Sequence, residues 1–379
     1  MYIERVLAKE LLIQIKKKRS CLILGRGQTG KTTLIKQLKV DLYLNLSKPK
    51  LRKKYEMDPD VLEKECLALL ENSSKKPIIV IDEIQKVPDL MNVIQSLVDD
   101  HQIQFILTGS SARKLKKISQ TNLLPGRLIS LKMSPISLNE SSLLQNGEIE
   151  DILDFGSLPT ILIETDPRQK GIELKSYVES YLEEEVRQEA LVRSLPQFYR
   201  FLECAALESG KIVSFNKIAQ DIGVAQTTIT SYYSILEDCL IVDRVDPIIE
   251  THNRKKLSKS SKYLFFDLGV RRLAAKEGRN YHPTRKGDLF EHFIGNQIIS
   301  YIKQNNLEAS LHYWKDLDGP EVDWVLKVGS HFLPIEVKLT EGPSKEDMKH
   351  LLTFKKEYKC PNGALVVCCC SPKQKLADN

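Results

Sequence analysis

Short apolar runs separated by longer amphipathic segments fill the first part of the chain. The run Pro77–Ile81 is apolar throughout, which is typical of a parallel strand covered on both faces. We predict further strands at Ser20–Leu24, Asp41–Leu46, Ile103–Leu107 and Leu128–Met133, and helices between them, after a first helix at Ile3–Lys18. This alternation favours an α/β layer domain with a parallel sheet, which we place at residues 1–145.

The pattern becomes helical after about residue 151. We expect two helices first, at Tyr177–Leu191 and Gln197–Leu207. A short helix from Phe215, a turn at Gly223 and a second helix then match a helix-turn-helix. The alternating segment Cys239–Val245 suits the strand of a wing. Together these elements predict a helical and winged-helix region over residues 146–250.

The last third of the chain returns to short apolar runs after a polar, basic segment, Thr251–Lys262, which we interpret as a linker. Five runs predict strands, at Tyr263–Phe266, Leu311–Trp314, Val322–Leu326, Phe332–Val337 and Ala364–Cys369. They indicate a second α/β domain over residues 251–379.

Composition agrees with a multidomain globular protein. A chain of 379 residues is too long for one ordinary core, and 42% hydrophobic with 28% charged residues argues against disorder. The net charge of +6 permits a nucleic-acid partner without requiring one.

The cysteines and the N-terminus point to the cytoplasm. Eight cysteines form no CxxC pair, which favours reduced thiols rather than disulfides or a metal site. The start Met1–Arg5 lacks the layout of a signal peptide. No apolar run reaches the roughly 18–20 residues that cross a bilayer. We therefore expect a cytoplasmic protein without a membrane segment.

A glycine-rich motif follows the first predicted strand. The segment consists of Gly25, Arg26, Gly27, Gln28, Thr29, Gly30, Lys31, Thr32 and Thr33, and it contains the pattern GxxxxGK[ST]. Backbone N–H groups of such a loop surround phosphates, and the following helix adds its positive end. Lys31 would neutralise the β- and γ-phosphates, and Thr32 would hold Mg²⁺. The alternative is a glycine turn that only connects strand and helix.

An acidic pair follows the apolar run near residue 80. Asp82 would reach the far side of Mg²⁺, and Glu83 would orient and deprotonate the attacking water. An acidic pair at a strand end is often only solvated, but the glycine-rich motif earlier in the chain favours the functional interpretation. The cofactors that we predict are ATP and Mg²⁺.

Four more residues are candidates for the same site. Thr108 and Ser110 end the next strand, where a hydroxyl could sense the γ-phosphate or cap a helix. Arg113 and Arg127 are candidate arginine fingers.

The motifs in their linked order resemble bacterial and archaeal AAA-type ATPases. The resemblance rests on GKTTL, IDEIQ, LTGSSARKL and LPGRLISLKMSPISLNE, and continues through FGSLP, KYLFFDLGV, GDLFEHFIGNQ, EVDWVL and PIEVK. In this family the ATPase precedes a winged-helix region and a C-terminal domain of uncharacterised role. One departure is Arg26-Gly27, where relatives usually carry Pro-Arg.

The resemblance implies three features. The ATPase sheet should have an extra strand between the P-loop strand and the Asp-Glu strand. The C-terminal domain should be related to restriction-endonuclease-like, PD-(D/E)xK folds. Such ATPases often form rings in which an arginine reaches a neighbour's nucleotide, so Arg127 makes a homo-oligomer plausible.

The helix-turn-helix is a candidate DNA-binding element. Ala219 and Gly223 are small enough to let its helices cross closely, and the second helix would expose Gln226, Thr227, Thr228, Thr230 and Ser231. These side chains can contact phosphates or base edges, but packing or oligomer contacts explain them equally well. The basic residues Arg254, Lys255, Lys256, Lys259 and Lys262 would contact phosphates or simply be solvated.

Carboxylates near the C-terminus form a candidate nuclease site. Asp323 lies on one predicted strand, and the next strand carries Glu336 and Lys338 on one face. Glu291 on a predicted helix could reach the same place, and Glu321 is a further acid nearby. Carboxylates beside a lysine can bind Mg²⁺ and activate water against a phosphodiester. The alternative is an inherited fold whose acids only pair with lysines.

Three functions therefore remain open. The first is an ATPase that acts on DNA, with a metal-dependent nuclease domain. The second is a nucleotide-controlled switch that docks a partner protein. The third is a nucleotide-binding scaffold without relevant turnover.

Overall fold

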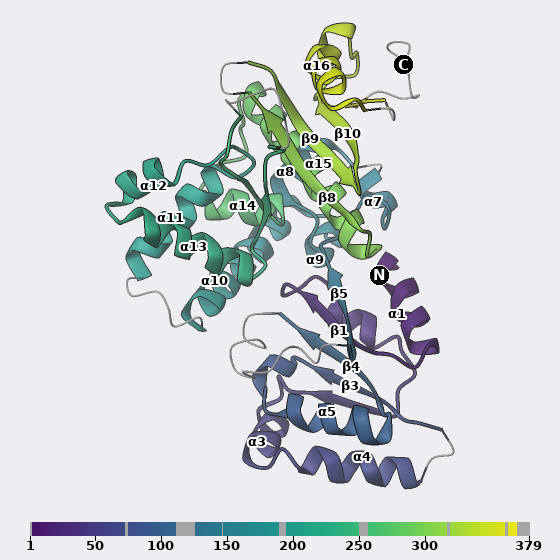
Figure 1. Ribbon diagram of the computed structural model, residues 1–379. Helices are drawn as coiled ribbons and strands as arrows, with labels where there is room; N and C mark the ends of the chain where they lie inside the picture. Colours follow the sequence, from purple (N-terminus) through teal and green to yellow (C-terminus); the bar gives the residue numbers. More distant parts are fainter. Residues whose placement is uncertain are drawn as a thin grey trace.

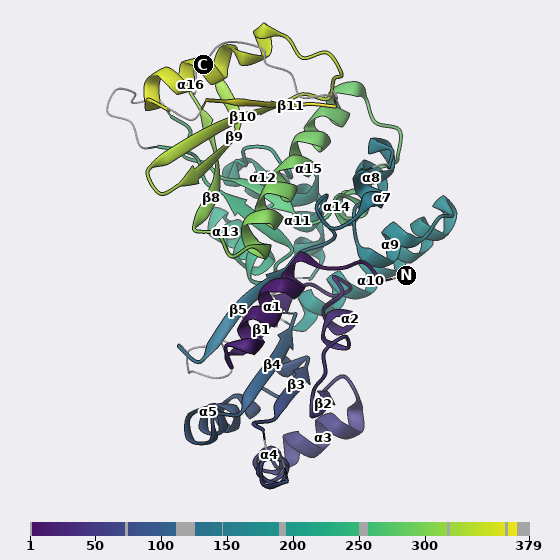
Figure 2. The same cartoon turned by 90° about the vertical axis from the view of Figure 1, so that its right-hand side faces the viewer.

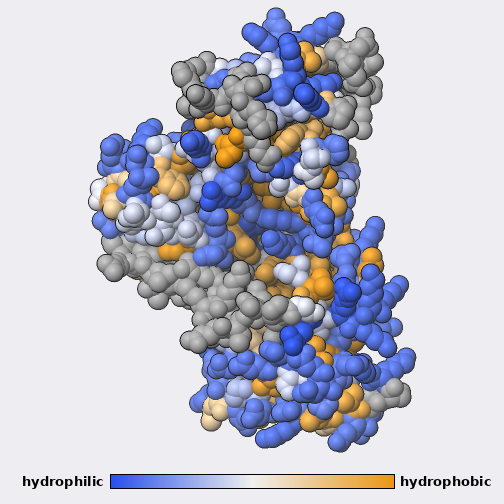
Figure 3. Space-filling view, in the orientation of Figure 1, coloured by the Kyte–Doolittle hydropathy of each residue, from blue (hydrophilic) through white to orange (hydrophobic). Residues whose placement is uncertain are grey.

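The structure is a computed structural model that describes residues 2–72, 75–110, 126–145, 147–188, 195–249, 257–316, 319–360 and 363–369. The N-terminal sheet lies at one end of the molecule and the C-terminal sheet at the other (Figures 1 and 2). The helices from α10 to α13 project to one side of Figure 1. Hydrophilic side chains cover most of the face shown in Figure 3, with scattered hydrophobic patches.

The N-terminal sheet has five parallel strands in the order β2-β3-β4-β1-β5. Their bounds are β1 Ser20–Gly25, β2 Leu42–Asn45, β3 Ile78–Asp82, β4 Gln104–Gly109 and β5 Leu128–Met133. The prediction of a parallel α/β sheet is confirmed. Strand β4 lies between β1 and β3, so the extra strand implied by the resemblance is present.

Helices cover both faces of this sheet. They are α1 Val6–Lys16, α2 Lys31–Ile35, α3 Pro49–Met57, α4 Val61–Glu71 and α5 Leu90–His101. Neighbouring residues of β1 face opposite sides. Leu22 and Leu24 pack in one cluster with Ile94 of α5, whereas Cys21 and Ile23 pack in a second cluster. Leu7 and Leu11 of α1 belong to this second cluster. The continuous apolar runs of the sequence follow from this two-sided burial.

The middle of the chain is mainly helical. Its elements are α7 Ser142–Gln145, α8 Ile149–Phe155, α9 Pro159–Ile163, α10 Pro167–Gln188, α11 Leu195–Leu207, α12 Phe215–Ile222, α13 Gln226–Asp238 and α14 Leu268–Ala274. The Ser214 hydroxyl accepts the Lys217 N–H at the start of α12. Gly223 ends α12 at φ +76°, a left-handed conformation that favours glycine.

The two-stranded sheet after α13 corrects one expectation. Strand β6 (Val242–Val245) pairs antiparallel with β7 (Lys262–Phe265), although we expected β7 in the C-terminal sheet. Tyr263 stacks on Tyr233 of α13 with 4.1 Å between ring centroids. Burial against the helical region therefore holds β7 beside β6. The winged-helix interpretation of this arrangement stays a prediction.

The C-terminal sheet has the order β11-β10-β9-β8, antiparallel except for the β10–β11 pair. The elements are α15 Pro283–Gln304, β8 Ala309–Lys315, β9 Glu321–Val328, β10 His331–Val337, a 3-10 turn at Lys345–Met348, α16 Lys349–Tyr358 and β11 Leu365–Val367. Phe293 of α15 packs with Trp324 in one cluster, and Phe354 of α16 packs with Trp314 in another. Two helices thus cover opposite faces. The restriction-endonuclease-like assignment stays a prediction.

None of the described helices is long and apolar enough to cross a bilayer.

Candidate nucleotide site and C-terminal acidic cluster

The P-loop connects the end of β1 to the start of α2. Gly30 has φ +96°, a conformation that side chains other than glycine rarely adopt. The buried Lys31 ammonium donates hydrogen bonds to the carbonyls of Gly25 (2.7 Å) and Arg26 (2.9 Å). These hydrogen bonds therefore hold the Lys31 side chain within the loop where it is predicted to contact the phosphates.

Asp82 is the centre of a buried polar group beside the P-loop. Its Oδ2 accepts hydrogen bonds from the hydroxyls of Thr32 (2.9 Å) and Tyr43 (3.0 Å). Its Oδ1 accepts one from Thr108 (2.5 Å). Burial and the Asp82 charge raise the pKa of Tyr43 to about 12, so this hydroxyl remains a donor. The oxygen atoms of Thr32 and Asp82 are the kind that Mg²⁺ prefers.

Glu83 follows in a strained conformation. Its φ is +63°, which is uncommon for a residue with a side chain and often marks a functional position. Its N–H donates to the Thr108 hydroxyl at 3.0 Å. The Gln85 amide donates to Glu83 Oε2 (2.5 Å) and to the Ser110 hydroxyl (2.9 Å). We did not expect Gln85 in the site, although it belongs to the quoted IDEIQ motif.

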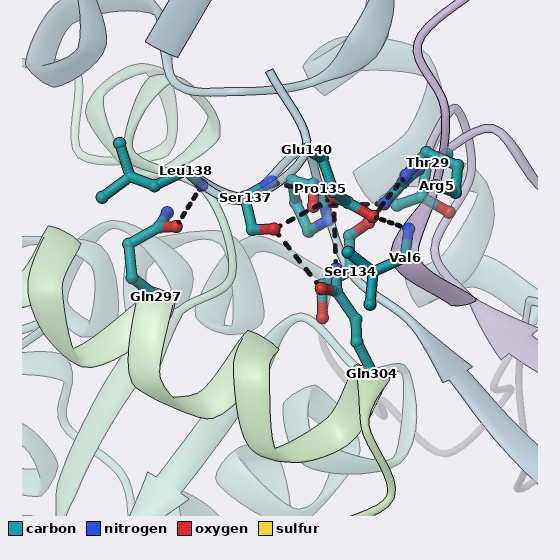
Figure 4. Close-up of polar contacts among 10 residues, drawn as sticks. All are labelled: Arg5, Val6, Thr29, Ser134, Pro135, Ser137, Leu138, Glu140, Gln297 and Gln304. Carbon is teal, nitrogen blue, oxygen red and sulfur yellow. Dashed lines mark hydrogen bonds and ion pairs between the residues drawn. The ribbon is translucent and has the colours of Figure 1, made fainter. Parts of the chain in front are cut away.

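Arg5, a buried arginine near the start of the chain, donates a hydrogen bond to the backbone of the P-loop (Figure 4). Arg5 donates to the carbonyls of Thr29 (2.5 Å) and Ser134 (2.6 Å) and pairs with Glu140, with 2.9 Å between Nε and Oε1. Glu140 Oε2 accepts from Gln304 of α15 at 3.3 Å. Hydrogen bonds thus connect the P-loop to the long C-terminal helix. No residue pattern in the sequence identified Arg5.

Arg26 provides a second connection out of the P-loop. Its guanidinium lies 4.3 Å from the centre of the Phe266 ring, and Nη2 is 3.5 Å from Oδ2 of Asp243 on β6. Lys303 of α15 also pairs with Asp243. Burial opposes the charge, but the charges of Lys303 and Arg26 lower the pKa of Asp243 below its usual range. Arg26 therefore connects the loop to β6 and, through Asp243, to α15.

The remaining P-loop residues contact the helical region. The Tyr177 hydroxyl donates to the Gly27 carbonyl at 3.1 Å, and the Thr160 hydroxyl donates to Gln28 Oε1 at 3.4 Å. A cavity of about 130 Å³ adjoins Gly30. It is lined by Tyr2, Ile3, Arg5, Gly30, Thr33, Ile136, Pro159, Thr160 and Ile163. Thr33 thus faces the cavity rather than the Asp82 group.

The structure does not bring Arg127 to the P-loop of its own chain. Leu128 is in register with Ser20 at the start of β1, whereas the P-loop follows the end of that strand. Arg127 lies at this opposite edge and pairs with Asp99 at 2.6 Å. A role toward a neighbouring chain stays a prediction. The other candidate finger, Arg113, lies outside the described residues, as do Arg254, Lys255 and Lys256.

The predicted nuclease residues lie in one neighbourhood, but each has a partner within the protein. Lys338 Nζ is 2.6 Å from Glu336 Oε1, and Asp323 Oδ2 accepts the Val337 N–H at 2.8 Å. Glu291 Oε1 pairs at 2.8 Å with Lys262 Nζ. Lys262 is a residue that we had assigned to a basic linker.

Burial dominates the electrostatics of this acidic cluster. It raises the pKa of Glu291 to about 7 and that of Asp323 to about 6, and it raises that of Glu336. Burial works against the charge of Lys262, but the neighbouring Glu291, followed by the other acids, raises its pKa above the usual value. In the part of the chain that the structure describes, no three His, Cys, Asp or Glu side chains form a group that could hold a metal ion.

The parallel sheet, the P-loop and the Thr32–Asp82 contact define the N-terminal part as a P-loop ATPase-like domain. A family model described as "AAA domain" matches residues 17–142. Two models described as "Domain of unknown function", DUF8612 and DUF4143, match residues 146–280 and 286–379.

Similar proteins give no function to transfer. An uncharacterised protein of Mycobacterium tuberculosis is 25% identical, covering 85% of this chain and 71% of its own. An uncharacterised protein of Haemophilus influenzae is 23% identical, and the match covers 76% of this chain and 72% of that protein. An uncharacterised protein of Methanocaldococcus jannaschii is 24% identical, and the match covers 93% of this chain and 82% of that protein.

Among solved structures, the Pif1 helicase from Candida albicans is similar with a TM-score of 0.24 and 13% identity. That match covers 47% of this chain and 48% of the helicase. Drosophila ORC bound to AT-rich DNA and Cdc6 matches with a TM-score of 0.26 and 7% identity, covering 72% of this chain and 92% of that one. Scores this low support no conclusion about this chain.

Proposed function

We propose that this chain binds and hydrolyses ATP with Mg²⁺, and that its nucleotide state controls the helical and C-terminal parts. The observation that carries the proposal is the Asp82 group: Asp82 accepts hydrogen bonds from Thr32 and Thr108, and Thr108 accepts the N–H of the strained Glu83. In a P-loop ATPase these positions supply the metal contacts, the base and the phosphate contact.

The contacts of the site residues support a separate role for each of them. Thr32 and Asp82 would hold Mg²⁺, which neutralises charge on the phosphates. Lys31 would exchange its carbonyl partners for phosphate oxygens. Glu83 would orient the attacking water, with Gln85 fixing its carboxylate and Thr108 fixing its backbone. The cavity beside Gly30 adjoins the P-loop and is largely apolar, so the base of the nucleotide would lie against it.

Two chains of contacts support the switch. Thr29 is linked through Arg5 and Glu140 to Gln304, and Arg26 is linked through Asp243 to Lys303. Both end on α15, the helix that packs against the C-terminal sheet. A phosphate-induced change in the P-loop would therefore alter contacts outside the ATPase domain. Such coupling is worth typically about 1–3 kcal/mol.

DNA is the second candidate target, because a polar pocket of about 340 Å³ lies between α12, α13 and the two-stranded sheet. Asn216, Gln226, Arg244 and Lys259 contribute to its lining, and such groups can contact phosphates and bases. Against this, the hydroxyls of Thr230, Ser231 and Ser234 on α13 donate to backbone carbonyls of the same helix. We therefore propose that this surface binds a protein rather than DNA.

The ATPase is tested with Glu83→Gln and Lys31→Ala in the full chain, measuring ATP binding and phosphate release separately. We expect Glu83→Gln to retain ATP and lose turnover, and Lys31→Ala to lose binding. Glu56→Gln, at an exposed position on α3, is the matched control. Turnover unchanged in Glu83→Gln would contradict the proposed base.

The switch is tested with Asp243→Asn, at a position on β6 that lies outside the P-loop and contacts the loop through Arg26. We expect a several-fold change in ATP affinity or turnover because Arg26 loses its carboxylate partner. Wild-type values would rule out coupling through this route. Adding duplex or single-stranded DNA to the same reactions decides the target, since stimulation would favour DNA over a protein.

A further inference from the structure

Lys262 enters the C-terminal acidic cluster from outside the C-terminal sheet. It is the first residue of β7, and its side chain is 3% exposed. The ammonium lies 4.9 Å from the centre of the Trp324 ring and 5.1 Å from that of Tyr313. Both rings attract a cation through their faces, so the packing holds the charge in place.

The Lys262 ammonium also forms ion pairs with two carboxylates, those of Glu291 and Glu321. Lys262 Nζ is 2.8 Å from Glu291 Oε1 and 3.4 Å from Glu321 Oε1. Glu321 is in addition 2.7 Å from Lys315. One buried cation therefore lies between two carboxylates, the position that a metal ion takes in an acidic site.

A magnesium ion does not fit beside this ammonium. Mg²⁺ needs about six oxygen ligands at about 2.0–2.1 Å, whereas the nearest carboxylates are already paired with Lys262 and Lys338. A divalent ion within a few ångströms of a buried ammonium would be strongly repelled. The residues present thus disagree with the metal site that a restriction-endonuclease-like domain implies.

One atom of the cluster still faces inward without a partner. Glu336 is 6% exposed, and its Oε2 is buried and accepts no hydrogen bond from any described residue. A buried carboxylate oxygen in this condition is costly. In the absence of the Lys262 ammonium, this oxygen atom of Glu336 could coordinate a metal ion.

We infer that the Lys262 ammonium is the built-in cation of this acidic cluster and excludes a divalent metal ion from it. The C-terminal domain then binds no Mg²⁺ there and cleaves no DNA by that route. Lys262 joins β7 to α15 and β9 through its charge contacts. This inference does not depend on the ATPase, because the cluster lies in a different part of the chain.

The test is Mn²⁺ binding to the nucleotide-free full chain, counted by electron paramagnetic resonance. We compare wild type with Lys262→Met, which replaces the ammonium by an uncharged, unbranched side chain of similar size, and with Lys262→Arg, which keeps the charge. Lys64→Met, at a position with 75% side-chain exposure, is the matched control. We expect about one additional Mn²⁺ only in Lys262→Met, lost again when Glu336→Gln is added.

Two results would overturn the inference. One is wild-type protein that binds Mn²⁺ and loses it on Glu336→Gln, a comparison that does not require Lys262→Met to fold. The other is a folded Lys262→Met variant, checked by circular dichroism, that gains no Mn²⁺.

Discussion

Arg5 and Glu140, separated by 135 positions in the sequence, form a buried ion pair with 2.9 Å between Nε and Oε1. Their side chains are 3% and 0% exposed. The guanidinium also donates to the Thr29 carbonyl of the P-loop. The pair therefore joins the start of the chain, the nucleotide loop and the segment after β5 into one polar network (Figure 4).

Removing one member of this pair should cost far more than removing an exposed charge. Glu140→Ala leaves the Arg5 guanidinium buried without its carboxylate, which typically costs about 3–5 kcal/mol. We expect the free energy of unfolding in urea to fall by about that amount. ATP affinity should fall as well, because Arg5 positions Thr29. Lys64→Ala, which removes an exposed charge, should leave both unchanged. An unaltered stability for Glu140→Ala would show that the pair is not formed.

Gln85 should act on turnover rather than on binding. It donates to Glu83 Oε2 and to Ser110, so Gln85→Ala frees the carboxylate of the predicted base. We expect kcat for ATP hydrolysis to fall by about tenfold or more with KM nearly unchanged. Ser110→Ala should give a smaller effect in the same direction. A rise in KM with unchanged kcat would assign Gln85 to nucleotide binding instead.

His292 should make stability depend on pH. Burial lowers its pKa to about 3, and its Nε2 lies 2.8 Å from the Phe265 carbonyl. The unfolded state, with a pKa of about 6.5, binds the proton first. Stability is therefore complete above about pH 6.5 and falls as the pH is lowered toward 3.

The slope from this residue should approach about 1.4 kcal/mol per pH unit within that window. Urea unfolding of wild type and His292→Asn between pH 4 and 7 measures it. The difference in unfolding free energy between the two should shrink at lower pH. His331→Gln, at an exposed position, is the control. A difference that does not vary with pH would mean that His292 is not the titrating group.

Local sequence patterns predicted the parts of the site that lie at the ends of neighbouring parallel strands. The P-loop follows a strand and opens a helix, and parallel strands end at the same edge of a sheet, so Thr32 and Asp82 meet as expected. The strand positions of the C-terminal sheet were predictable for the same reason, since period-2 burial and a hairpin turn are local signals.

Contacts between distant segments could not be predicted in this way. Arg5 has no local feature that distinguishes it from other arginines, because its partner Glu140 is fixed only by the folded structure. Lys262 sits in a basic stretch, yet β7 turns it into the acidic cluster beside Glu291. Arg127 lies at the edge of the sheet opposite the P-loop of its own chain because it precedes β5 rather than following it, and its role toward a neighbouring chain stays a prediction.

The most direct test of the central claim is single-turnover hydrolysis of ATP by the purified full chain, with and without Mg²⁺. We predict phosphate release that requires Mg²⁺ in wild type and is lost in Glu83→Gln, while the variant keeps ATP bound. Wild-type protein that binds ATP and releases no phosphate, or phosphate release that persists in Glu83→Gln, would contradict it.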